Sequence, residues 1–296
     1  MSRPDREFPV SLPDLKMILE EAAEIVRELF HQGGPVGKKS DGSPLTPADL
    51  RANRFLQTRL LGLLPGVGWL SEEGAPDEGR LDRPWIWIVD PLDGTKEFAR
   101  GIPELAISIG LVKDHQVVAA GVINPITGEG GVGSSRGGAE FWGFPSARKG
   151  AQNLEEAVAG ISRRETDDGT VIPYLDLVGS VRVLGSVAYK LLRVASGLED
   201  LTFSVQHKSE WDVCGGVGLL NFAGKLYRRF DGQPLQFNQP NTRIRCGAVA
   251  GPEKLVEEFI LKLKERSPGA GLPGEFAPWV AGGTLTELND QEENRL

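Results

Sequence analysis

A buried strand that runs into two aspartates constrains this chain more than any other feature of its sequence. The segment Trp87–Phe98 begins with an apolar run, meets Asp90 and Asp93, and continues through Gly94 and Thr95 into a helix start. Carboxylates at the end of a buried strand, beside free backbone N–H groups, can hold hard divalent cations and a phosphate together. The alternative is an Asx turn whose carboxylates are merely solvated. Turn chemistry explains the proline and the glycine of the segment, but not two acids, so the pattern favours a cation site.

The composition is that of an ordinary globular chain with an acidic balance. The chain has 296 residues and a formal net charge of -8 at pH 7, with 40% hydrophobic and 25% charged residues. This length allows one large domain or two medium ones that share a cleft. Non-specific nucleic-acid binding needs clustered lysine and arginine, which the sequence lacks, so we expect no nucleic-acid partner. An acidic protein still binds anionic phosphates where metal ions invert the local charge.

Targeting and redox features of the sequence favour a cytoplasmic protein. Residues Met1–Phe8 mix charges with a proline and lack the apolar centre of a signal peptide. No stretch approaches the ~20 consecutive apolar residues of a transmembrane helix, so we expect no membrane association. Cys214 and Cys246 are the only cysteines, which is too few for a disulfide framework in a chain of this size.

Periodic apolar residues predict helices and strands along most of the chain. One helix is expected to begin with Thr46 as its N-cap, Pro47 at its first position and Asp49 at its third. The glycine-rich stretch 128–143 predicts either a hairpin or a loop, and residues 287–296 a frayed tail. Further helices are expected over residues 11–31, 186–195, 212–223 and 252–266, and strands over 85–89, 105–112, 117–123, 181–184, 203–205 and 246–250, with a hairpin turn at 113–116.

Acidic side chains stand out at four separate places in the sequence. Besides Asp90 and Asp93, these are Asp49, the pair Glu72–Glu73, and Asp212. Three of the four places have an ordinary structural explanation when each is taken alone. Asp49 would be an acid in the first turn of a helix, the glutamate pair a solvated face, and Asp212 an N-cap. The histidines show neither triad nor metal spacing.

Several motifs, in consistent order along the chain, resemble those of the inositol monophosphatase superfamily. The segment Asp90–Thr95 resembles the first signature of this superfamily, and Trp211–Gly216 resembles the second. Ser71–Gly74 lies at the family's usual distance before the first signature, and Thr46–Asp49 resembles an early threonine-to-aspartate turn. Shorter framework matches occur at residues 107–112, 121–125, 223–224 and 231–235. The resemblance spans roughly residues 12–265.

The resemblance implies a layered αβαβα sandwich of the sugar-phosphatase type, which is an α/β (α+β) fold. An N-terminal α+β part, residues 1–155, would carry most of the metal ligands. A C-terminal α/β part, residues 156–296, would supply Asp212 and a wall of the substrate site. A homodimer is common in the family, although nothing in the sequence identifies an interface.

The resemblance also implies a magnesium site. A first Mg²⁺ would be held by Glu72, Asp90 and the carbonyl of Leu92. Asp90 would hold a second Mg²⁺ together with Asp93 and Asp212, and a weaker third ion would reach Glu72 through water. Two cations can stabilise the attacking water and the leaving oxygen of a phosphate ester, and oxygen ligands suit Mg²⁺.

The remaining catalytic groups implied by the family are a hydroxyl, a carboxylate and backbone amides. The pairing of Asp49 with Thr95 would orient and deprotonate the attacking water. Charge on the phosphoryl oxygens would be met by the backbone N–H groups of Gly94 and Thr95 at a helix start. Cys214 is expected to be small core packing and not a nucleophile, because no base is paired with it.

Substrate contacts are expected from both halves of the chain. Gly185 and Ser186, before a helix, resemble the family's loop that contacts the sugar, and Lys190 lies one turn further on. The alternative is an ordinary strand-to-helix turn with Ser186 as N-cap. Lys96 is either a phosphate or nucleotide contact or a solvated helix lysine. Substrate contacts are also expected from Asp93, Gly94 and Thr95.

Details around the two signatures point to a branch of the superfamily. Gly94–Phe98 is similar to the 3'(2'),5'-bisphosphate nucleotidases, where inositol monophosphatases more often carry Thr-Asn-Phe. Residues 39–46 and Glu104 lean the same way. Val205 lies seven residues before the second-signature aspartate, where inositol monophosphatases commonly place a glutamate that contacts the inositol ring. Glu210 could substitute for that glutamate from a different position.

We therefore expect a Mg²⁺-dependent phosphomonoesterase that removes the 3'-phosphate of 3'-phosphoadenosine 5'-phosphate. Alternatives in the same class are phosphatases for inositol 1-phosphate or fructose 1,6-bisphosphate, which are polyol and sugar phosphates. An alternative of another class is a cation-binding regulatory protein without turnover, although metal storage alone requires neither Asp49 nor Thr95. The family also implies inhibition by Li⁺.

Overall fold

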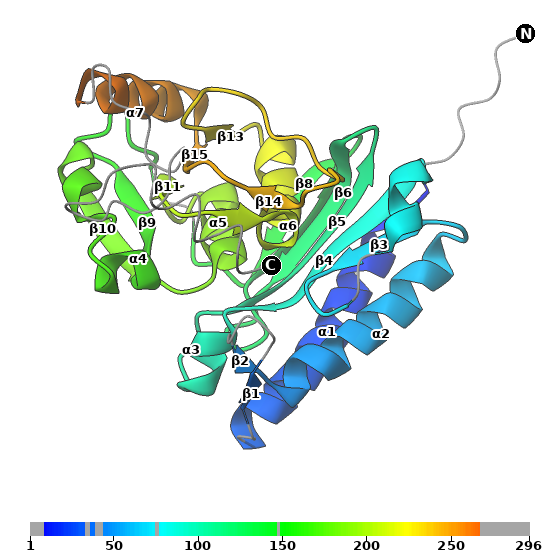
Figure 1. Ribbon diagram of the computed structural model, residues 1–296. Coiled ribbons are helices and arrows are strands. Elements are labelled where there is room, and N and C mark those ends of the chain that lie inside the picture. The colour runs from blue at the N-terminus through cyan, green and yellow to red at the C-terminus, as the bar shows by residue number, and fades with distance from the viewer. Residues whose placement is uncertain (1–8, 33–35, 39–43, 75–76, 147–148, 267–296) are drawn as a thin grey trace, which may run out of the picture.

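A six-stranded sheet at the centre of Figure 1 carries the first signature. The computed structural model describes residues 9–32, 36–38, 44–74, 77–146 and 149–266. The strand order in this sheet is β3-β4-β5-β6-β7-β8, and only the β3/β4 pair is parallel. Its strands are β3 (Gly68–Ser71), β4 (Trp85–Asp93), β5 (Ala106–Lys113), β6 (Gln116–Ile123), β7 (Gly130–Ser134) and β8 (Gly138–Trp142).

A second sheet of five strands has the order β10-β9-β11-β15-β13. β9 lies between two parallel neighbours, β10 and β11, whereas β15 is antiparallel to both of its neighbours. The strands are β9 (Val158–Ser162), β10 (Ser180–Leu184), β11 (Leu201–Ser204), β13 (Leu226–Arg229) and β15 (Ala248–Gly251). Two short pairs complete the described strands: β1 (Gly37–Lys38) with β2 (Pro44–Leu45), and β12 (Lys208–Ser209) with β14 (Arg243–Ile244).

Helices and sheets alternate in five layers, as Figure 1 shows. α1 (Leu12–Gln32) and α2 (Pro47–Leu63) cover one face of the six-stranded sheet. α5 (Val187–Ser196) and α6 (Glu210–Phe222) lie between the two sheets, and α7 (Glu253–Arg266) packs on the outer face of the five-stranded sheet. Short helices are α3 (Thr95–Ala99), α4 (Arg163–Asp167), η1 (Glu78–Asp82) and η2 (Ile172–Leu177). Three buried apolar clusters fill the spaces between these layers.

β4 is longer than the predicted strand 85–89 and contains a bulge within the signature. Asp90 pairs with Ser108 and Asp93 pairs with Ala106, and the register shifts between the two pairs. In a regular strand, residues three apart point to opposite faces of the sheet. One extra residue at the bulge brings both aspartates to the same side. The two acids therefore share a site because the strand bends between them.

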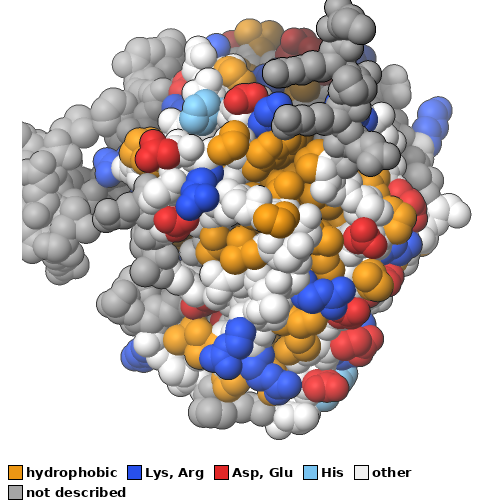
Figure 2. All heavy atoms as spheres, turned by 90° about the vertical axis from the view of Figure 1, so that its right-hand side faces the viewer, with side chains coloured by type: hydrophobic (Ala, Val, Ile, Leu, Met, Phe, Trp, Pro, Cys, Tyr) orange, Lys and Arg blue, Asp and Glu red, His pale blue; other side chains and the backbone are white. Residues whose placement is uncertain are grey.

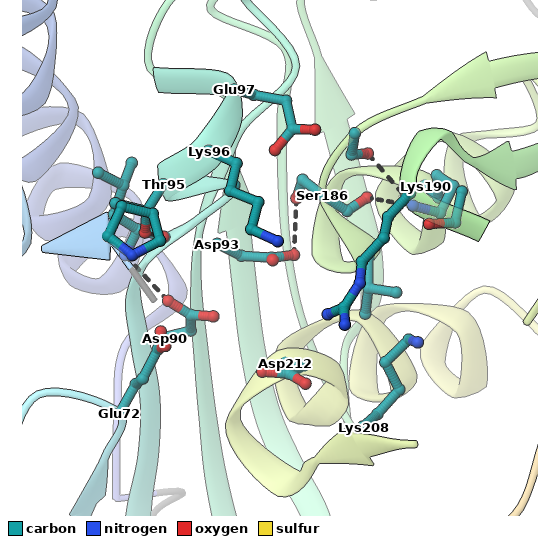
Figure 3. Close-up of a pocket in the computed structure, with 17 residues that line it drawn as sticks. Glu72, Asp90, Asp93, Thr95, Lys96, Glu97, Ser186, Lys190, Lys208 and Asp212 are labelled. Carbon is teal, nitrogen blue, oxygen red and sulfur yellow. Dashed lines mark hydrogen bonds between the residues drawn. The ribbon is translucent and has the colours of Figure 1, made fainter. Parts of the chain in front are cut away.

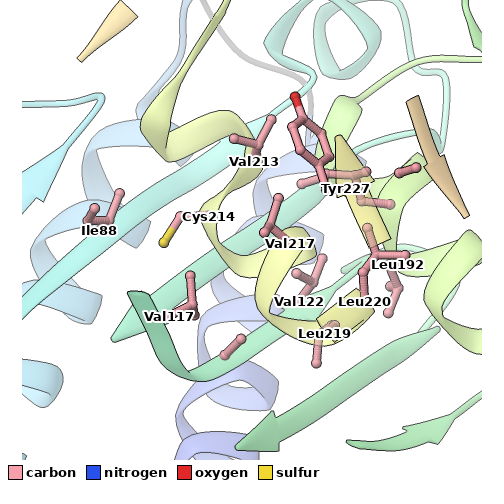
Figure 4. Close-up of a cluster of buried hydrophobic side chains, with 14 of the residues drawn as sticks. Ile88, Val117, Val122, Leu192, Val213, Cys214, Val217, Leu219, Leu220 and Tyr227 are labelled. Carbon is pink, nitrogen blue, oxygen red and sulfur yellow. The ribbon is translucent and has the colours of Figure 1, made fainter. Parts of the chain in front are cut away.

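Small residues let α6 lie close to the six-stranded sheet. A Cβ at Gly110 on β5 would lie 2.2 Å from Cys214 Sγ, and a Cβ at Gly215 would lie 2.6 Å from Ser108 Oγ. Cys214 is fully buried in the apolar cluster drawn in Figure 4, as expected for core packing. This close packing places the first turn of α6, which carries Asp212, next to β4.

Most predicted elements are confirmed, with small shifts at their ends. The predicted capping of α2 is present, because Ala48 N–H donates to Thr46 Oγ1 (3.2 Å) and Thr46 N–H donates to Asp49 Oδ2 (2.7 Å). The stretch 128–143 forms the hairpin β7–β8, the first of its two alternatives. Strands β3, β9 and β13 have four or five residues each and were not predicted. Residues 39–43 and the predicted tail 287–296 lie outside the described residues.

The molecular face in Figure 2 has no large patch of only positive or only negative side chains. Basic and acidic side chains are interspersed there, with hydrophobic side chains between them. None of the helices in the described ranges is long and apolar enough to cross a membrane. The predicted division at residue 155 falls in the connection between β8 and β9.

Candidate active site

A cavity of about 240 Å³ opens where the end of β4 meets the first turns of α5 and α6. Figure 3 shows acidic side chains from β4 and α6 on one side of this cavity and the lysines of α5 and β12 on the other. The cavity is lined by Pro44, Glu72, Asp90, Leu92, Asp93, Gly94, Thr95, Lys96, Glu97, Ser162, Arg164, Gly185, Ser186, Val187, Lys190, Lys208 and Asp212. The structure thus brings together all five residues predicted to hold metal.

Each aspartate of the cavity is anchored through one of its two carboxylate oxygens. Asp90 Oδ1 accepts a hydrogen bond from the backbone N–H of Leu92 (3.0 Å). Asp212 Oδ2 accepts one from the backbone N–H of Ser209 (2.7 Å), because Asp212 is the third residue of α6 and closes a capping box with Ser209. Asp212 is therefore a first-turn acid and not the N-cap that one reading of the sequence suggested.

Asp93 is anchored across the cavity by the start of α5. Its Oδ2 accepts hydrogen bonds from the Ser186 hydroxyl (2.7 Å) and from the backbone N–H of Ala188 (2.6 Å). Among the described residues, no donor lies within hydrogen-bond distance of the second oxygen of Asp90, Asp93 or Asp212. Each aspartate is held in place while one oxygen stays available to a ligand.

The acids of the cavity raise one another's pKa values. Burial raises the pKa of Asp90 well above its ordinary value, and the charges of Glu72, Asp93 and Asp212 raise it further. Burial also raises the pKa of Asp212, again with help from Asp93 and Glu72, and nearby Lys208 offsets this only in part. Mutual repulsion of this kind shows that the nearby lysines do not fully compensate the charge of the clustered acids.

The donor set fits hard divalent cations. The available groups are carboxylate oxygens and the carbonyl of Leu92, and oxygen ligands of this kind suit Mg²⁺ rather than softer metals. Within the described ranges, no group of three or more acid, histidine or cysteine side chains is already arranged to hold a metal ion. The fit of the cavity to a divalent cation therefore rests on its oxygen ligands, on the hydrogen bonds that anchor the aspartates, and on the incompletely compensated charge of the acids.

Asp49 and Thr95 form the predicted pair, just beneath the cavity wall. The Thr95 hydroxyl lies 3.0 Å from Asp49 Oδ1 and 3.2 Å from the carbonyl oxygen of Leu92, so its single proton serves one acceptor at a time. Asp49 Oδ2 is held by the backbone N–H of Thr46 (2.7 Å) and by its hydroxyl (2.6 Å). Asp49 is thus both a first-turn helix acid and the partner of Thr95.

The predicted substrate residues of α5 line the cavity and also build the helix start. Ser186 is the N-cap of α5, since its Oγ accepts the backbone N–H of Tyr189 (3.0 Å). Lys190 Nζ donates to the carbonyls of Gly185 (3.2 Å) and Ser186 (2.9 Å), which holds the lysine under the turn. Burial lowers the pKa of Lys190 to about 8, although nearby Asp93 partly offsets this effect. The two interpretations of this turn are therefore compatible.

At the start of α3, Gly94 and Lys96 also line the cavity. Gly94 has φ of 104°, and a Cβ there would lie 3.0 Å from the carbonyl oxygen of Glu104, so only glycine fits. Lys96 is exposed, and its side chain makes no hydrogen bond or ion pair with another described residue. α3 has five residues, so its dipole contributes little to anion binding and its local N–H groups matter more.

Glu210 does not reach the cavity, in contrast to the expectation that it could contact an inositol ring. It is buried elsewhere, where it accepts the backbone N–H groups of Asn238 (2.6 Å) and Gln239 (2.8 Å). The reason is helical geometry, because residues two apart on a helix point about 200° away from each other. With Asp212 facing the cavity, Glu210 must face away from it.

Sequence motifs did not indicate the basic residues Arg164 and Lys208. Both line the cavity, and Lys208 Nζ lies 3.3 Å from Glu165 Oε1. Glu165 is fully buried and also accepts the backbone N–H of Val205 (3.1 Å). It thereby fixes the segment that leads to Lys208. A buried glutamate paired across 43 residues leaves no short-range sequence pattern.

Comparison with known protein families identifies the family of the chain. The model of the inositol monophosphatase family matches residues 12–267. The chain belongs to this family. Family members are metal-dependent phosphatases, and the protein is accordingly a phosphatase of this family.

The relatives differ in the substrates that their names state. The chain is 35% identical over 197 residues to an inositol-1-monophosphatase of Rhizobium meliloti (strain 1021), covering 64% of this chain and 73% of the relative. It is 28% identical over 253 residues to the 3'(2'),5'-bisphosphate nucleotidase CysQ of Aggregatibacter actinomycetemcomitans, covering 81% and 92%. Most of the similar curated relatives carry inositol monophosphatase names.

Solved structures show the same fold. The extragenic suppressor protein suhB from Bartonella henselae superposes with a TM-score of 0.73 at 24% identity, covering 87% of this chain and 98% of that one. The layered α/β sandwich expected from the sequence is thereby confirmed.

Proposed function

We propose that this protein hydrolyses the phosphate monoester of a small polyol, with inositol monophosphate as its first substrate, and that it uses Mg²⁺ to do so. The observation that carries this proposal is one cavity in which three singly anchored aspartates and Glu72 lie beside the Asp49–Thr95 pair. The names of the relatives favour inositol phosphate over the bisphosphate nucleotide that the first signature suggested.

Two Mg²⁺ ions are proposed, with a weaker third reached by Glu72 through water. Glu72, Asp90 and the Leu92 carbonyl would hold the first, and Asp90 would hold the second with Asp93 and Asp212. When bound, Mg²⁺ neutralises the acids and supplies the Lewis acidity that activates water and stabilises the leaving oxygen. The backbone bonds to Asp90, Asp93 and Asp212 orient these acids before any cation arrives.

The proton of the attacking water is proposed to leave through Thr95. The Thr95 oxygen accepts this proton as its own proton passes to Asp49 Oδ1, 3.0 Å away. Asp49 keeps its position during this transfer because Thr46 holds its other oxygen through two hydrogen bonds. A buried carboxylate fixed in this manner can act as the base without a histidine.

A second candidate substrate is 3'-phosphoadenosine 5'-phosphate. The observation in its favour is the pair of cations, Arg164 and Lys208, that faces the acids across the cavity and could receive a second anionic group. A further point is Val205, which stands where inositol monophosphatases commonly have a glutamate that contacts the inositol ring. Val205 does not line the cavity. Fructose 1,6-bisphosphate has the same two-anion character and belongs in the same test. Family membership does not favour a cation-binding protein without turnover.

The deciding experiment measures phosphate release with Mg²⁺ from inositol 1-phosphate, 3'-phosphoadenosine 5'-phosphate and fructose 1,6-bisphosphate at matched concentrations. We expect the highest kcat/KM for inositol 1-phosphate. Asp90→Asn and Thr95→Ala should each reduce kcat by about 10²- to 10⁴-fold, because each removes a group acting on the reacting atoms. Asp82→Asn, which changes an exposed acid in η1, is the matched control and should leave kcat unchanged.

The outcomes separate the parts of the proposal. A strong preference for the nucleotide would refute inositol phosphate as the substrate. Arg164 and Lys208 would then be assigned to the second phosphate of the nucleotide. Unchanged turnover in Asp90→Asn and Thr95→Ala would refute the site itself.

A further inference from the structure

Glu104, in the loop between α3 and β5, joins the two halves of the molecule at the edge of the cavity. One guanidinium nitrogen of Arg163 (Nη2) lies 2.8 and 2.6 Å from its two carboxylate oxygens. The backbone N–H of Gly185 donates to Glu104 Oε2 at 2.7 Å. Both partners belong to the half with the five-stranded sheet, and both side chains of the ion pair are largely removed from solvent. None of these three residues takes part in the metal binding or the proton transfer proposed above.

The turn that Glu104 holds is closely packed and strained. A Cβ at Gly185 would lie 2.4 Å from Glu97 Cγ and 2.8 Å from the carbonyl oxygen of Glu104, so the turn lies directly on this loop. The next residue, Ser186, has φ of 46°, which is unfavourable for any residue with a Cβ. A strained turn persists only where its surroundings hold it, and the Glu104 carboxylate supplies one such contact.

The same turn anchors a metal-site acid. Ser186 Oγ and the Ala188 N–H both bind Asp93 Oδ2, so the position of the turn decides how the Asp93 carboxylate is rotated. In Figure 3 the Ser186 hydroxyl reaches Asp93 across the cavity. The chain of contacts therefore runs from Glu104 through Gly185 and Ser186 to Asp93.

We propose that Glu104 is a positioning residue of the metal site. Its carboxylate, with Arg163, holds the 185–188 turn against Asp93 and leaves Asp93 Oδ1 directed into the cavity. This inference rests on the proposed function, because it assigns Asp93 to a cation. Glu104 does not line the cavity, so it acts on the metal site through the turn and not by contact with a metal ion or substrate.

A second bridge between the halves supplies the matched control. Glu129, between β6 and β7, accepts a hydrogen bond from the Tyr189 hydroxyl and lies 3.4 Å from Arg193 Nη1, both on α5. It joins α5 itself to the six-stranded sheet, and it has no hydrogen bond or ion pair with the 185–188 turn or with Asp93. Glu129→Gln therefore removes a comparable cross-link without disturbing the anchor of Asp93.

The test compares Glu104→Gln, Glu104→Ala and Glu129→Gln with the wild type, using Mn²⁺ binding by calorimetry without substrate. Partners that orient a metal ligand typically contribute about 10- to 100-fold to affinity. We expect Glu104→Ala to weaken Mn²⁺ binding within that range, Glu104→Gln to weaken it less, and Glu129→Gln to leave it unchanged. In metal-free protein, amide hydrogen exchange over residues 185–188 should accelerate in the Glu104 variants alone.

Two results would overturn the proposal. One is an equal loss of Mn²⁺ affinity in Glu104→Ala and Glu129→Gln, which would make Glu104 a general cross-link. The other is unchanged Mn²⁺ affinity and exchange in both Glu104 variants. Wild-type protein that binds Mn²⁺ but releases phosphate from no tested ester would refute the proposed function, while the same comparison would still decide the role of Glu104. Thermal melts check that each variant is folded. If Glu104→Ala unfolds, Glu104→Gln carries the test, because glutamine keeps the volume of the glutamate side chain.

Discussion

Replacing Asp90 by asparagine should stabilise the metal-free protein while it lowers kcat by about 10²- to 10⁴-fold. Asp90 is 1% exposed and is repelled by three neighbouring carboxylates, so its charge opposes folding until a cation binds. An asparagine keeps the shape, and its Oδ1 can still accept the backbone N–H of Leu92. Nothing buried loses its hydrogen-bond partner, and one of four mutually repelling charges disappears.

The size of the effect follows from the burial of Asp90. Replacing a buried ion pair by neutral residues of similar volume is often neutral or stabilises by about 1–4 kcal/mol, and Asp90 has less compensation than a member of such a pair. A gain of ~2 kcal/mol would raise Tm by roughly 3 °C for a chain of this size, because the entropy of unfolding is about 2.1 cal/mol/K per residue. Mg²⁺ should reverse the order of stability. At 100 times its Kd, an ion bound only by the folded state adds about 2.7 kcal/mol, and Asp90→Asn would lose most of this gain.

The assay is thermal unfolding of wild type, Asp90→Asn and the exposed-acid control Asp82→Asn, in EDTA and in saturating Mg²⁺, at a fixed pH of about 8. The expected result is a crossing: Asp90→Asn melts above wild type in EDTA and below it in Mg²⁺, whereas the control follows wild type in both. A variant that melts below wild type in EDTA would refute the reasoning, because the Asp90 charge would then be compensated within the protein.

Three further predictions concern Glu165, Lys208 and the proposed second Mg²⁺ position. Burial raises the pKa of Glu165, but Lys208 and the hydrogen bonds from Ser204 and Val205 outweigh burial and lower the pKa from 4.5. The stabilisation from Glu165 is therefore present above that value and lost as pH falls through the lower folded-state pKa, so the Tm deficit of Glu165→Gln at pH 7 should shrink in acid. A Tm deficit of Glu165→Gln that stays the same as the pH is lowered would contradict this prediction. Lys208→Met should reduce kcat/KM for 3'-phosphoadenosine 5'-phosphate roughly tenfold more than for inositol 1-phosphate, and equal losses would argue against a second-anion contact. Li⁺ brings one charge where Mg²⁺ brings two, so steady-state kinetics should show uncompetitive or mixed inhibition, and full activity at high millimolar Li⁺ would count against this metal geometry.

Asp90 and Asp93 could be predicted as cation ligands from a local structural landmark, whereas the roles of Asp49, Glu72 and Asp212 came from the family resemblance. Asp49 and Asp212 occupy the third positions of capped helices, and Asp90 and Asp93 flank a bulge at the end of a buried strand. Short-range patterns define such landmarks, so a single sequence contains them. The pairing of Asp49 with Thr95 came from the family resemblance and not from local pattern.

The basic side of the cavity could not be predicted by the same means. Lys208 reaches the cavity because a glutamate 43 residues earlier in the chain is buried beneath it, and that contact forms only when Glu165 of α4 meets Ser204 and Val205 at the end of β11. The misplaced expectation for Glu210 has a related cause. Proximity in sequence to Asp212 suggested proximity in space, but the helix between them rotates the two side chains apart.

The structural and functional explanations of these acids prove compatible because a carboxylate has two oxygens. A backbone or hydroxyl donor on one oxygen fixes the rotation of the side chain, which a ligand for a hard cation requires. The same donor neutralises too little charge to compete with that cation, so the anchored acid stays available. Asp90, Asp93 and Asp212 all follow this arrangement, and Asp49 applies it to a proton instead of a metal. Helix starts therefore suit such a site, since the bonds that begin the helices also orient the oxygens proposed to bind the cations.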